Sequence, residues 1–251
     1  MEPQLLHSVT DSVATVVIHH PEKRNAMTSA MWAALPPLLD TLAADPRVRA
    51  LVLTGAGGTF CAGADIGALK DTPDEAQGLA KLAEDALGDF PKPTLAAVRG
   101  HCVGGGTQLA AACDLRFAEE GALFGVTPAK LGIVYPASST RRLVALMGPS
   151  TAKYLLFSGE LIDSARALRT GLVDELLPVG ELDKRVAEFT RILVSRSQLT
   201  QASAKEFANG RPDRDAHWTE QARGSGDLAE GVAAFLERRR PHFTWSVPTS
   251  E

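Results

Sequence analysis

The sequence predicts an α/β fold for this 251-residue chain, and three observations support the prediction. Short runs rich in apolar and β-branched residues at 12–20, 49–55 and 93–100 have the character of strands. Helical patterns fill the intervals between them, and repeated strand-to-helix transitions are typical of α/β proteins. From residue 180 onward the strand-like runs stop and amphipathic helices follow.

The N-terminal half alternates strands and helices. A helical pattern at 28–44 follows the first strand and contains Pro36 and Pro37. We expect the two prolines to kink or restart this helix, because proline donates no amide hydrogen bond and clashes with the preceding turn. The elements expected in this half are strands at 12–20, 49–55 and 93–100, helices at 28–44, about 73–89 and 105–113, and two very short strands around a glycine turn within 114–125.

The C-terminal half is mostly helical. Asp163 is a suitable N-cap for a helix at 163–170, and Gly171 is a suitable stop. The other helices expected are 139–147, 150–157, 181–196, a stretch around 197–209, and 227–240. No low-complexity linker divides the chain, so we expect a core at residues 1–195 and a helical appendage of the same unit at 196–251.

Composition excludes several classes of protein. Apolar residues make up 45% and charged residues 22%, with a net charge of −4, which indicates an ordinary globular protein without a basic surface for nucleic acid. The sequence has no 18-residue apolar stretch and no apolar run after a basic N-terminal flank, so we expect neither a membrane span nor a signal peptide. Cys61, Cys102 and Cys113 are odd in number and lack CxxC spacing, which predicts buried, reduced thiols and a cytoplasmic location.

Common catalytic and cofactor motifs are missing. The glycine-rich segments 55–60 and 100–106 do not fit G-x-G-x-x-G spacing, and there is no G-x-x-x-x-G-K. These absences disfavour a dinucleotide oxidoreductase. No G-x-S-x-G elbow and no H-E-x-x-H pair occur, and the six histidines are scattered. We therefore expect no metal site and no serine hydrolase.

Three consecutive glycines, Gly104–Gly106, lead into an alanine-rich segment with the character of a buried helix. Glycine at a strand–helix junction lets a ligand approach the backbone, and the N–H groups of a first helical turn suit a developing negative charge. A second glycine-rich loop, 57–66, could supply another N–H, and two such donors on one oxygen form an oxyanion hole. The alternative is that these glycines only allow tight packing.

Four segments in this order resemble the crotonase superfamily, also called the enoyl-CoA hydratase/isomerase family. They are "PEKRNAM" (21–27), "LVLTGAGGTFCAGADI" (51–66), the stretch 92–125 around the three glycines, and "GLVDELLP" (171–178). The resemblance implies a spiral of ββα turns with a C-terminal helical region that forms trimers, often as a dimer of trimers. It also implies an acyl-CoA thioester ligand whose carbonyl is held between two peptide N–H groups, which fall here on Ala64 and Gly105.

The resemblance also maps a coenzyme A site. Lys23 and Arg24 fall where the family's first loop meets the ribose and phosphates, and Ala62, Asp65 and Ile66 fall in the segment around the adenine. Coenzyme A enters as part of the substrate, so no separate cofactor is expected.

The C-terminal tail supplies the rest of that coenzyme A site. Phe235 and Arg238 match the tail that completes it, often from a neighbouring subunit. An arginine suits phosphate oxygens, although the "ERRR" run would also suit a solvated helix end.

Two positions depart from the hydratases of this family. Those enzymes use two glutamates to hold and activate water, and the matching positions here are Gln108 and Pro128. A glutamine amide does not exchange a proton near neutral pH, and proline has no functional side chain. Both acid/base groups are therefore missing, and ordinary hydration is not expected.

One segment suggests another reaction. Residues 127–135, "TPAKLGIVY", resemble the matching stretch of methylmalonyl-CoA decarboxylase, in which a tyrosine at the position of Tyr135 faces the reacting carboxylate. That enzyme differs at the positions of Ala64 and Gln108, where it has a histidine and an acidic residue. Tyr135 could instead pack in the core with its hydroxyl bonded to the backbone.

Three function classes stay open at this point. The first is an acyl-CoA enzyme that acts through a thioester enolate, with decarboxylation as one reaction of this kind. The second is a non-catalytic acyl-CoA binding protein on the same fold. The third is a hydratase with atypical acid/base groups, for which Lys130, His101 and Asp65 are the nearest candidates.

Overall fold

The computed structural model describes residues 2–67 and 73–248, and its centre is a six-stranded sheet in the order β1-β2-β3-β4-β6-β9. The first two strands are antiparallel and every later neighbour is parallel. The strands are β1 Gln4–Thr10, β2 Val13–His19, β3 Ala50–Gly55, β4 Thr94–Val98, β6 Leu115–Glu119 and β9 Glu175–Leu177. The predicted strands at 12–20, 49–55 and 93–100 are confirmed, whereas β1 and β9 were not predicted.

A second, three-stranded sheet has the order β5-β7-β8. Its strands are β5 His101–Val103, β7 Leu123–Gly125 and β8 Leu161–Asp163. The two short strands expected within 114–125 are β6 and β7, with Gly121 in the turn at φ 86°, but they enter different sheets and form no hairpin. The chain thus repeats a unit in which one strand joins the large sheet, the next joins the small sheet and a helix follows. This repeat is the ββα spiral that the family resemblance implies.

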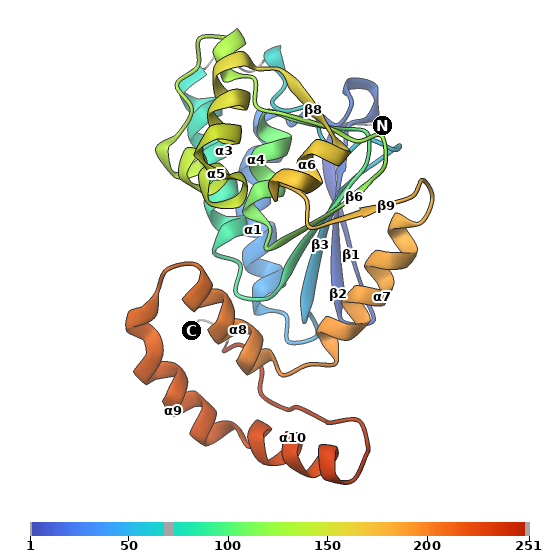
Figure 1. Ribbon diagram of the computed structural model, residues 1–251, viewed down its shortest axis with the longest axis vertical. Coiled ribbons are helices and arrows are strands. Elements are labelled where there is room, and N and C mark those ends of the chain that lie inside the picture. The colour runs from blue at the N-terminus through green and yellow to red at the C-terminus, as the bar shows by residue number, and fades with distance from the viewer. Residues whose placement is uncertain (1, 68–72, 249–251) are drawn as a thin grey trace.

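Helices cover the two faces of the large sheet unequally (Figure 1). One face packs against helices α1 Ser29–Ala44, α3 Pro73–Gly88, α4 Gly105–Ala112 and α5 Ala137–Ser158, with α6 Ser164–Thr170 beside them. Alternate strand residues, such as Val52 and Phe117, point to the other face, which α7 Leu182–Val194 covers. No helix in the described part of the chain is long and apolar enough to span a membrane.

Helix α1 runs through Pro36 and Pro37 without interruption, so the predicted restart is wrong. Pro37 is exposed and Pro36 is half-buried, so neither belongs to the fully buried face of the helix. That face is held by five buried residues: Met31, Trp32, Leu35, Leu39 and Leu42. Burial of this apolar stripe outweighs the lost hydrogen bonds.

Local signals elsewhere match the structure. The Asp163 side chain caps α6 by accepting a hydrogen bond from Arg166 N, and Gly171 ends the helix at φ 85°. The helices expected at 139–147 and 150–157 are the two parts of α5, divided at Gly148, whose φ of 74° is not helical. The helix expected over 227–240 ends earlier, at Leu236.

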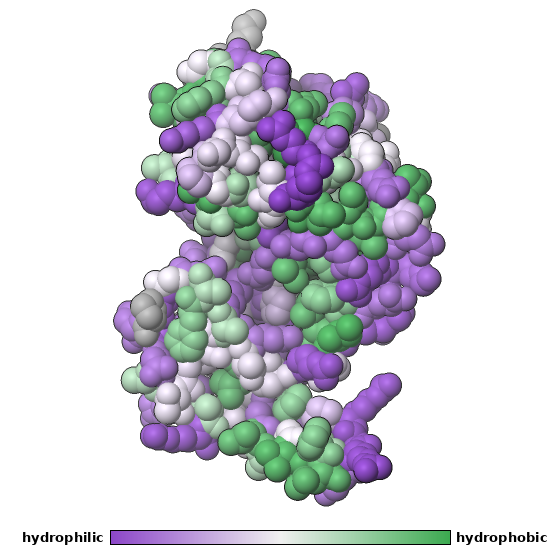
Figure 2. Space-filling model, viewed as in Figure 1, coloured by the Kyte–Doolittle hydropathy of each residue, from purple (hydrophilic) through white to green (hydrophobic). Residues whose placement is uncertain are grey.

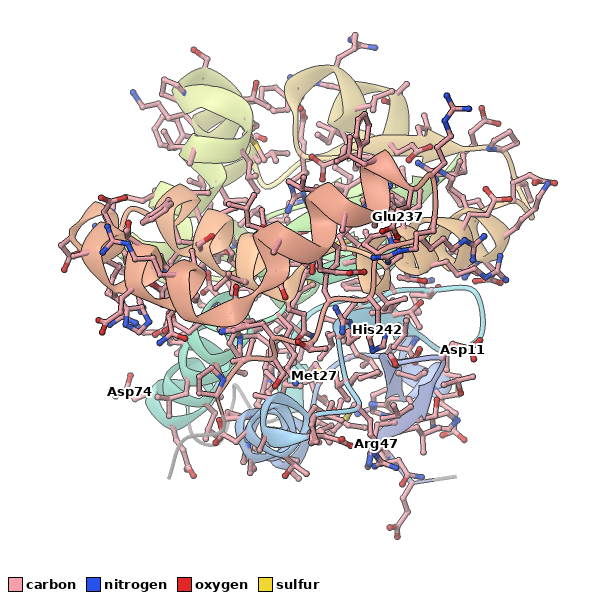
Figure 3. The ribbon with its side chains drawn as sticks, turned by 90° about the horizontal axis from the view of Figure 1, so that it is seen from below. Asp11, Met27, Arg47, Asp74, Glu237 and His242 are labelled. Atoms are coloured by element: carbon pink, nitrogen blue, oxygen red, sulfur yellow. The ribbon has the colours of Figure 1, made fainter. Side chains whose placement is uncertain are left out.

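The C-terminal helices form a separate layer beyond one end of the sheet (Figure 1). They are α8 Gln198–Ala208, α9 Asp215–Ser225 and α10 Asp227–Leu236, of which α9 was not predicted. Seen from below, this layer lies across the end of the molecule (Figure 3). Its own apolar core is small, consisting of Leu199, Ala202 and Trp218 with Trp245 and Val247 packed against them.

Helix α10 carries a large exposed apolar surface, visible at the bottom of Figure 2. Leu228, Phe235 and Leu236 are each more than 70% exposed. Contiguous apolar surface of this kind is typical of a face that another protein covers. The division of the chain at residue 195 and the trimer-forming role of the tail stay predictions.

The three cysteines lie unpaired in the core. Burial raises the pKa of the Cys61 and Cys113 thiols to about 12, and it raises the pKa of Cys102 as well. Because the thiolate is the reactive form, the native protein should react very slowly with Ellman's reagent at pH 8, and all three thiols should react in 6 M guanidinium. Rapid reaction of the native protein would contradict this packing.

Candidate active site

A cavity of about 120 Å³ lies where the two glycine-rich loops meet. Helices α1, α3 and α4 contribute to its wall, and the segment 127–136 closes it. The predicted site residues that line it are Ala62, Ala64, Ile66, Gly105, Gln108, Pro128 and Tyr135. The structure therefore brings together the residues expected at the acyl end of the ligand and two of those expected around the adenine, Ala62 and Ile66.

Each of the three glycines is required by the packing of this turn. Gly104 has φ 56° and ψ −118°, a conformation that residues with a side chain rarely adopt. A Cβ on Gly106 would lie 2.2 Å from the carbonyl oxygen of Cys61, and a Cβ on Gly105 would lie 2.9 Å from Trp32 Cζ2. Tight packing alone thus accounts for the glycines, and the case for an oxyanion hole depends on where the N–H groups point.

The Ala64 amide points toward the glycine turn. Gly63 O accepts a hydrogen bond from Met27 N at 2.8 Å, and Asp65 N donates to Met27 O at 2.8 Å. The C=O of Gly63 and the N–H of Ala64 belong to one trans peptide group and point in opposite directions, so the N–H of Ala64 faces away from Met27. The Ala64 nitrogen lies 3.6 Å from the place where a Cβ on Gly105 would stand.

The Gly105 amide belongs to the first turn of α4, where N–H groups have no intrahelical acceptor. Two hydrogen bonds fix this turn: Gly104 N donates to Gly125 O at 2.8 Å, and Thr107 Oγ1 donates to Cys102 O at 2.6 Å. Within the described residues, neither Ala64 N nor Gly105 N donates a hydrogen bond to the protein. Two fixed amides therefore border one cavity.

Two further donors in the cavity wall also lack partners. The Tyr135 hydroxyl and Trp32 Nε1 are buried, and neither has a hydrogen-bond partner among the described residues. The alternative in which the Tyr135 hydroxyl bonds to the backbone is therefore wrong. Burial raises the pKa of the Tyr135 phenol above its ordinary value, so this group is a neutral donor at physiological pH.

Gln108 reaches the cavity from α4 and is tied to a buried carboxylate. Its Nε2 donates to Glu84 Oε2 at 2.5 Å and to Ser139 Oγ at 3.3 Å. Glu84 lies on α3, is fully buried, and forms an ion pair with Arg142 through its other oxygen. Pro128, at the second position of interest, is buried and begins a short 3₁₀ turn.

The residues expected around coenzyme A lie on two adjacent loops. Lys23 Nζ forms an ion pair with Asp65 at 2.7 Å, and this hydrogen bond lowers the pKa of the Asp65 carboxyl. Ala62 N donates to Arg24 O at 3.0 Å, which joins the loops through the backbone. Ile66 is 60% exposed beside them.

Phe235 and Arg238 are not part of this cluster. They lie at the end of α10 or just beyond it, in the C-terminal layer and away from α4 (Figure 1). Both are exposed, and Phe235 is 83% exposed. A single copy of the chain does not bring them to the cavity.

The three acid/base candidates considered for a hydratase do not line the cavity. Asp65 is paired with Lys23. The Lys130 side chain lies along Gly159, with Cε 3.0 Å from the place of a Cβ there, and His101 is in strand β5. None of the three is among the described residues that form the wall.

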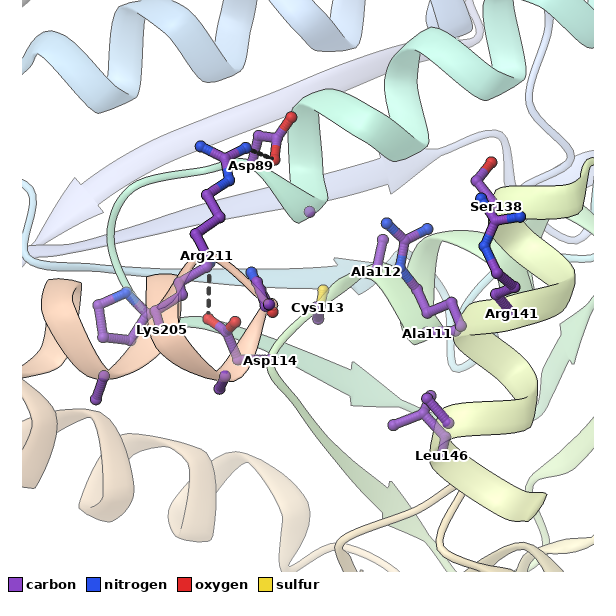
Figure 4. Close-up of a pocket in the computed structure, with 18 of the residues that line it drawn as sticks. Asp89, Ala111, Ala112, Cys113, Asp114, Ser138, Arg141, Leu146, Lys205 and Arg211 are labelled. Atoms are coloured by element: carbon purple, nitrogen blue, oxygen red, sulfur yellow. Dashed lines mark hydrogen bonds and ion pairs between the residues drawn. The ribbon is translucent and has the colours of Figure 1, made fainter. Parts of the chain in front are cut away.

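A larger pocket of about 920 Å³ lies between the core and α8 (Figure 4). Two ion pairs form between its charged side chains, Lys205 with Asp114 at 2.9 Å and Arg211 with Asp89 at 3.0 Å. None of the predicted site residues lines it. Within residues 2–67 and 73–248, no group of three or more His, Cys, Asp or Glu side chains is placed to hold a metal ion.

Sequence reasoning missed Trp32 and Glu84. Trp32 occupies a regular apolar position of α1, so nothing in the pattern separates it from an ordinary core residue. Glu84 could have been found, because it follows Ala76, Ala80 and Ala83 on the apolar face of α3. A carboxylate on such a face requires a partner.

Comparison with known proteins identifies the family. Residues 8–246 match the family model described as Enoyl-CoA hydratase/isomerase. A putative enoyl-CoA hydratase of Thermus thermophilus is 35% identical, over 92% of this chain and 97% of that protein. A crotonyl-CoA hydratase of Syntrophomonas wolfei is 32% identical, over 93% of this chain and 95% of that protein. The crystal structure of a putative enoyl-CoA hydratase/isomerase family protein from Hyphomonas neptunium superposes with a TM-score of 0.89 at 36% identity, covering 96% of this chain and 98% of that one. The chain belongs to the enoyl-CoA hydratase/isomerase, or crotonase, family.

Proposed function

We propose that this protein is an acyl-CoA thioester enzyme that stabilises a thioester enolate and decarboxylates a carboxylated acyl group. The observation that carries the proposal is the Tyr135 hydroxyl, a buried donor without a partner, in the same cavity as the amides of Ala64 and Gly105. Coenzyme A is part of the substrate in this proposal, and no separate cofactor or metal takes part.

The two amides suit the charge that such a reaction develops. When a thioester becomes an enolate, negative charge accumulates on its carbonyl oxygen. Fixed N–H donors at that point are worth about 3–4 kcal/mol each in the transition state, and they require no rearrangement during the reaction. Ala64 and Gly105 are held by backbone contacts on both sides, which supports this role.

Decarboxylation requires less acid/base chemistry than hydration. The bond between the carboxylate carbon and C2 breaks, its electron pair enters the enolate, and CO₂ leaves. A proton must then reach C2 to give the product thioester. A neutral phenol such as Tyr135 can donate a hydrogen bond to the carboxylate and afterwards supply that proton, which solvent returns.

The side chains at positions 108 and 128 support an enolate reaction rather than hydration. By resemblance, these positions carry the water-activating glutamates of hydratases, and here they are Gln108 and Pro128. Each general acid or base typically contributes about 10²–10⁴-fold to a rate. A hydratase lacking both would lose most of its activity.

Two other functions each have one observation in their favour. The absence of both glutamates also suits a non-catalytic acyl-CoA binding protein. The names of the Thermus and Syntrophomonas relatives favour a hydratase. The three functions differ in which thioester is consumed, so one set of incubations separates them.

We also propose that the protein works as a homotrimer or a dimer of trimers, in the cytoplasm. The exposed apolar face of α10 supports assembly, and the absence of Arg238 from the described residues that line the cavity supports a coenzyme A site completed by a neighbouring copy. The three unpaired thiols are compatible with a reducing compartment.

Carboxylated thioesters should therefore lose CO₂. We expect malonyl-CoA or methylmalonyl-CoA to be converted into the thioester lacking the carboxylate, measured by mass. Tyr135→Phe should slow this step by about 10²-fold, because it removes only the proton donor. The unfolding free energy should stay equal or rise by about 1 kcal/mol, because a buried donor without a partner is lost.

The same incubations would also show the results that contradict the proposed reaction. If no carboxylated thioester turns over while acyl-CoA still binds, the binding-protein alternative replaces this proposal. Robust hydration of crotonyl-CoA by pure protein would instead establish the hydratase.

Light scattering tests the assembly. We expect trimers or hexamers at micromolar concentration, because Leu228, Phe235 and Leu236 expose too much apolar surface for a stable monomer. Deletion of residues 197–251 should give monomeric or insoluble protein. A monomeric wild-type protein would refute the assembly.

Arg238→Ala tests the contribution of the tail to coenzyme A binding. Affinity for acetyl-CoA and for butyryl-CoA should fall by the same factor, because the acyl end is elsewhere, and the loss should shrink at high salt. Arg223→Ala, an exposed arginine on α9, is the matched control and should change neither affinity. A loss confined to one acyl group would contradict a phosphate contact.

A further inference from the structure

The Glu84 carboxylate lies beside the cavity, and the proposed reaction does not use it. It is fully buried, and a buried carboxylate is stable only with charge compensation and hydrogen bonds. Arg142 on α5 pairs with one oxygen, while Ser139 and Gln108 both donate to the other. The Arg142 side chain is 27% exposed, so this pair extends from the protein surface to the wall of the acyl cavity.

These contacts determine which end of the Gln108 amide faces the cavity. A carboxylate can only accept hydrogen bonds, so the end of the amide beside Glu84 must be its NH₂ group. The Ser139 hydroxyl donates to Glu84 and accepts from the same NH₂ group. The carbonyl oxygen, Oε1, is then at the cavity end of the side chain and has no partner among the described residues.

Glu84 also explains why position 108 holds an amide. A glutamate at 108 would place a second carboxylate within hydrogen-bond distance of Glu84. Two carboxylates so close cannot both be ionised without a large cost, so one would retain a proton at neutral pH. Position 108 next to Glu84 thus favours a neutral side chain that donates on one end and accepts on the other.

We infer that Glu84 is a positioning residue of the acyl site: it orients Gln108 so that a neutral acceptor oxygen faces the acyl group. An acceptor without a partner in a largely apolar cavity favours a ligand that brings a hydrogen-bond donor to it. The inference rests on the acyl site of the proposed function, and it does not depend on decarboxylation.

The first test measures the charge relation without any substrate. Urea unfolding of wild type, Gln108→Glu and Glu84→Gln/Gln108→Glu is followed from pH 5 to pH 8.5. A carboxyl whose pKa is raised in the folded state binds a proton more tightly there than in the unfolded chain. The stability of Gln108→Glu should therefore fall as the pH rises above about 4.3, the ordinary glutamate pKa, until the raised pKa is reached.

The equilibrium constant for unfolding of Gln108→Glu should grow, relative to that of wild type, by at most about tenfold per pH unit. The double variant has one carboxylate fewer and should lose this extra pH dependence. Gln4→Glu, on an exposed position of β1, is the matched control and should show none. If Gln108→Glu follows the wild-type pH dependence, Glu84 does not face position 108 and the inference fails.

The second test measures what Gln108 presents to the ligand. Dissociation constants are measured by calorimetry for free CoA, butyryl-CoA and each enantiomer of 3-hydroxybutyryl-CoA, which differs from butyryl-CoA by one hydroxyl donor. Wild type should bind one hydroxylated enantiomer several-fold more tightly than butyryl-CoA. Glu84→Gln should lose this preference, and Ser139→Ala, which leaves Glu84 in place, should lose less of it.

Free CoA should bind all three proteins equally, since it does not enter the acyl cavity, and this distinguishes mispositioning from loss of fold. An unchanged preference in Glu84→Gln, or no preference in wild type, would overturn the inference. Absence of decarboxylation would leave these ratios unaffected, so the inference and the proposed reaction can fail separately.

Discussion

The contact between residues 61–64 and the glycine turn at 104–106 is the constraint on which the site depends. Cys61 N donates to His101 O and Val103 N donates to Cys61 O, so the two loops pair as a short parallel bridge. Their approach is so close that a Cβ on Gly106 would overlap the Cys61 carbonyl. This contact places the amides of Ala64 and Gly105 beside each other without any side chain between them.

The cavity behind these amides combines apolar walls with a few polar atoms that the protein leaves without partners. Most buried polar groups in proteins are hydrogen-bonded, and the exceptions call for an explanation. The Tyr135 hydroxyl and Trp32 Nε1 are such exceptions, and Gln108, whose Nε2 is bound to Glu84, lines the same cavity. A ligand that forms hydrogen bonds with the hydroxyl and the indole nitrogen gains free energy on binding, because the free protein leaves them without partners. This is a physical basis for selecting a polar acyl group.

The sequence predicted well those parts of the fold that depend on local chemistry. Asp163 and Gly171 bound α6 as expected, since caps act over one turn. Strand β1 was missed because most of its residues are exposed and show no alternation, and β9 is only three residues long. The continuity of α1 through Pro36 and Pro37 depends on tertiary packing of its other face, which no local signal reveals.

The site residues divide in the same way, into those that sequence patterns predict and those that only the folded structure brings together. The glycine pattern and the family resemblance led to Ala64, Gly105, Gln108, Pro128 and Tyr135, all of which line the cavity. Glu84 reaches Gln108 only because α3 packs against α4 and α5, a contact between residues far apart in the chain. In the sequence, Trp32 has the character of an ordinary core residue. Only the structure shows that its indole packs against Gly105.

The central claim is that the amides of Ala64 and Gly105 together polarise a thioester carbonyl. The most direct measurement is the isotope-edited infrared spectrum of butyryl-CoA labelled with ¹³C at the carbonyl, free in water and bound to the protein. Two preorganised donors in a water-poor cavity should weaken the carbonyl bond more than water does, so its stretching frequency should fall on binding. A bound carbonyl that absorbs at or above its frequency in water would contradict the claim.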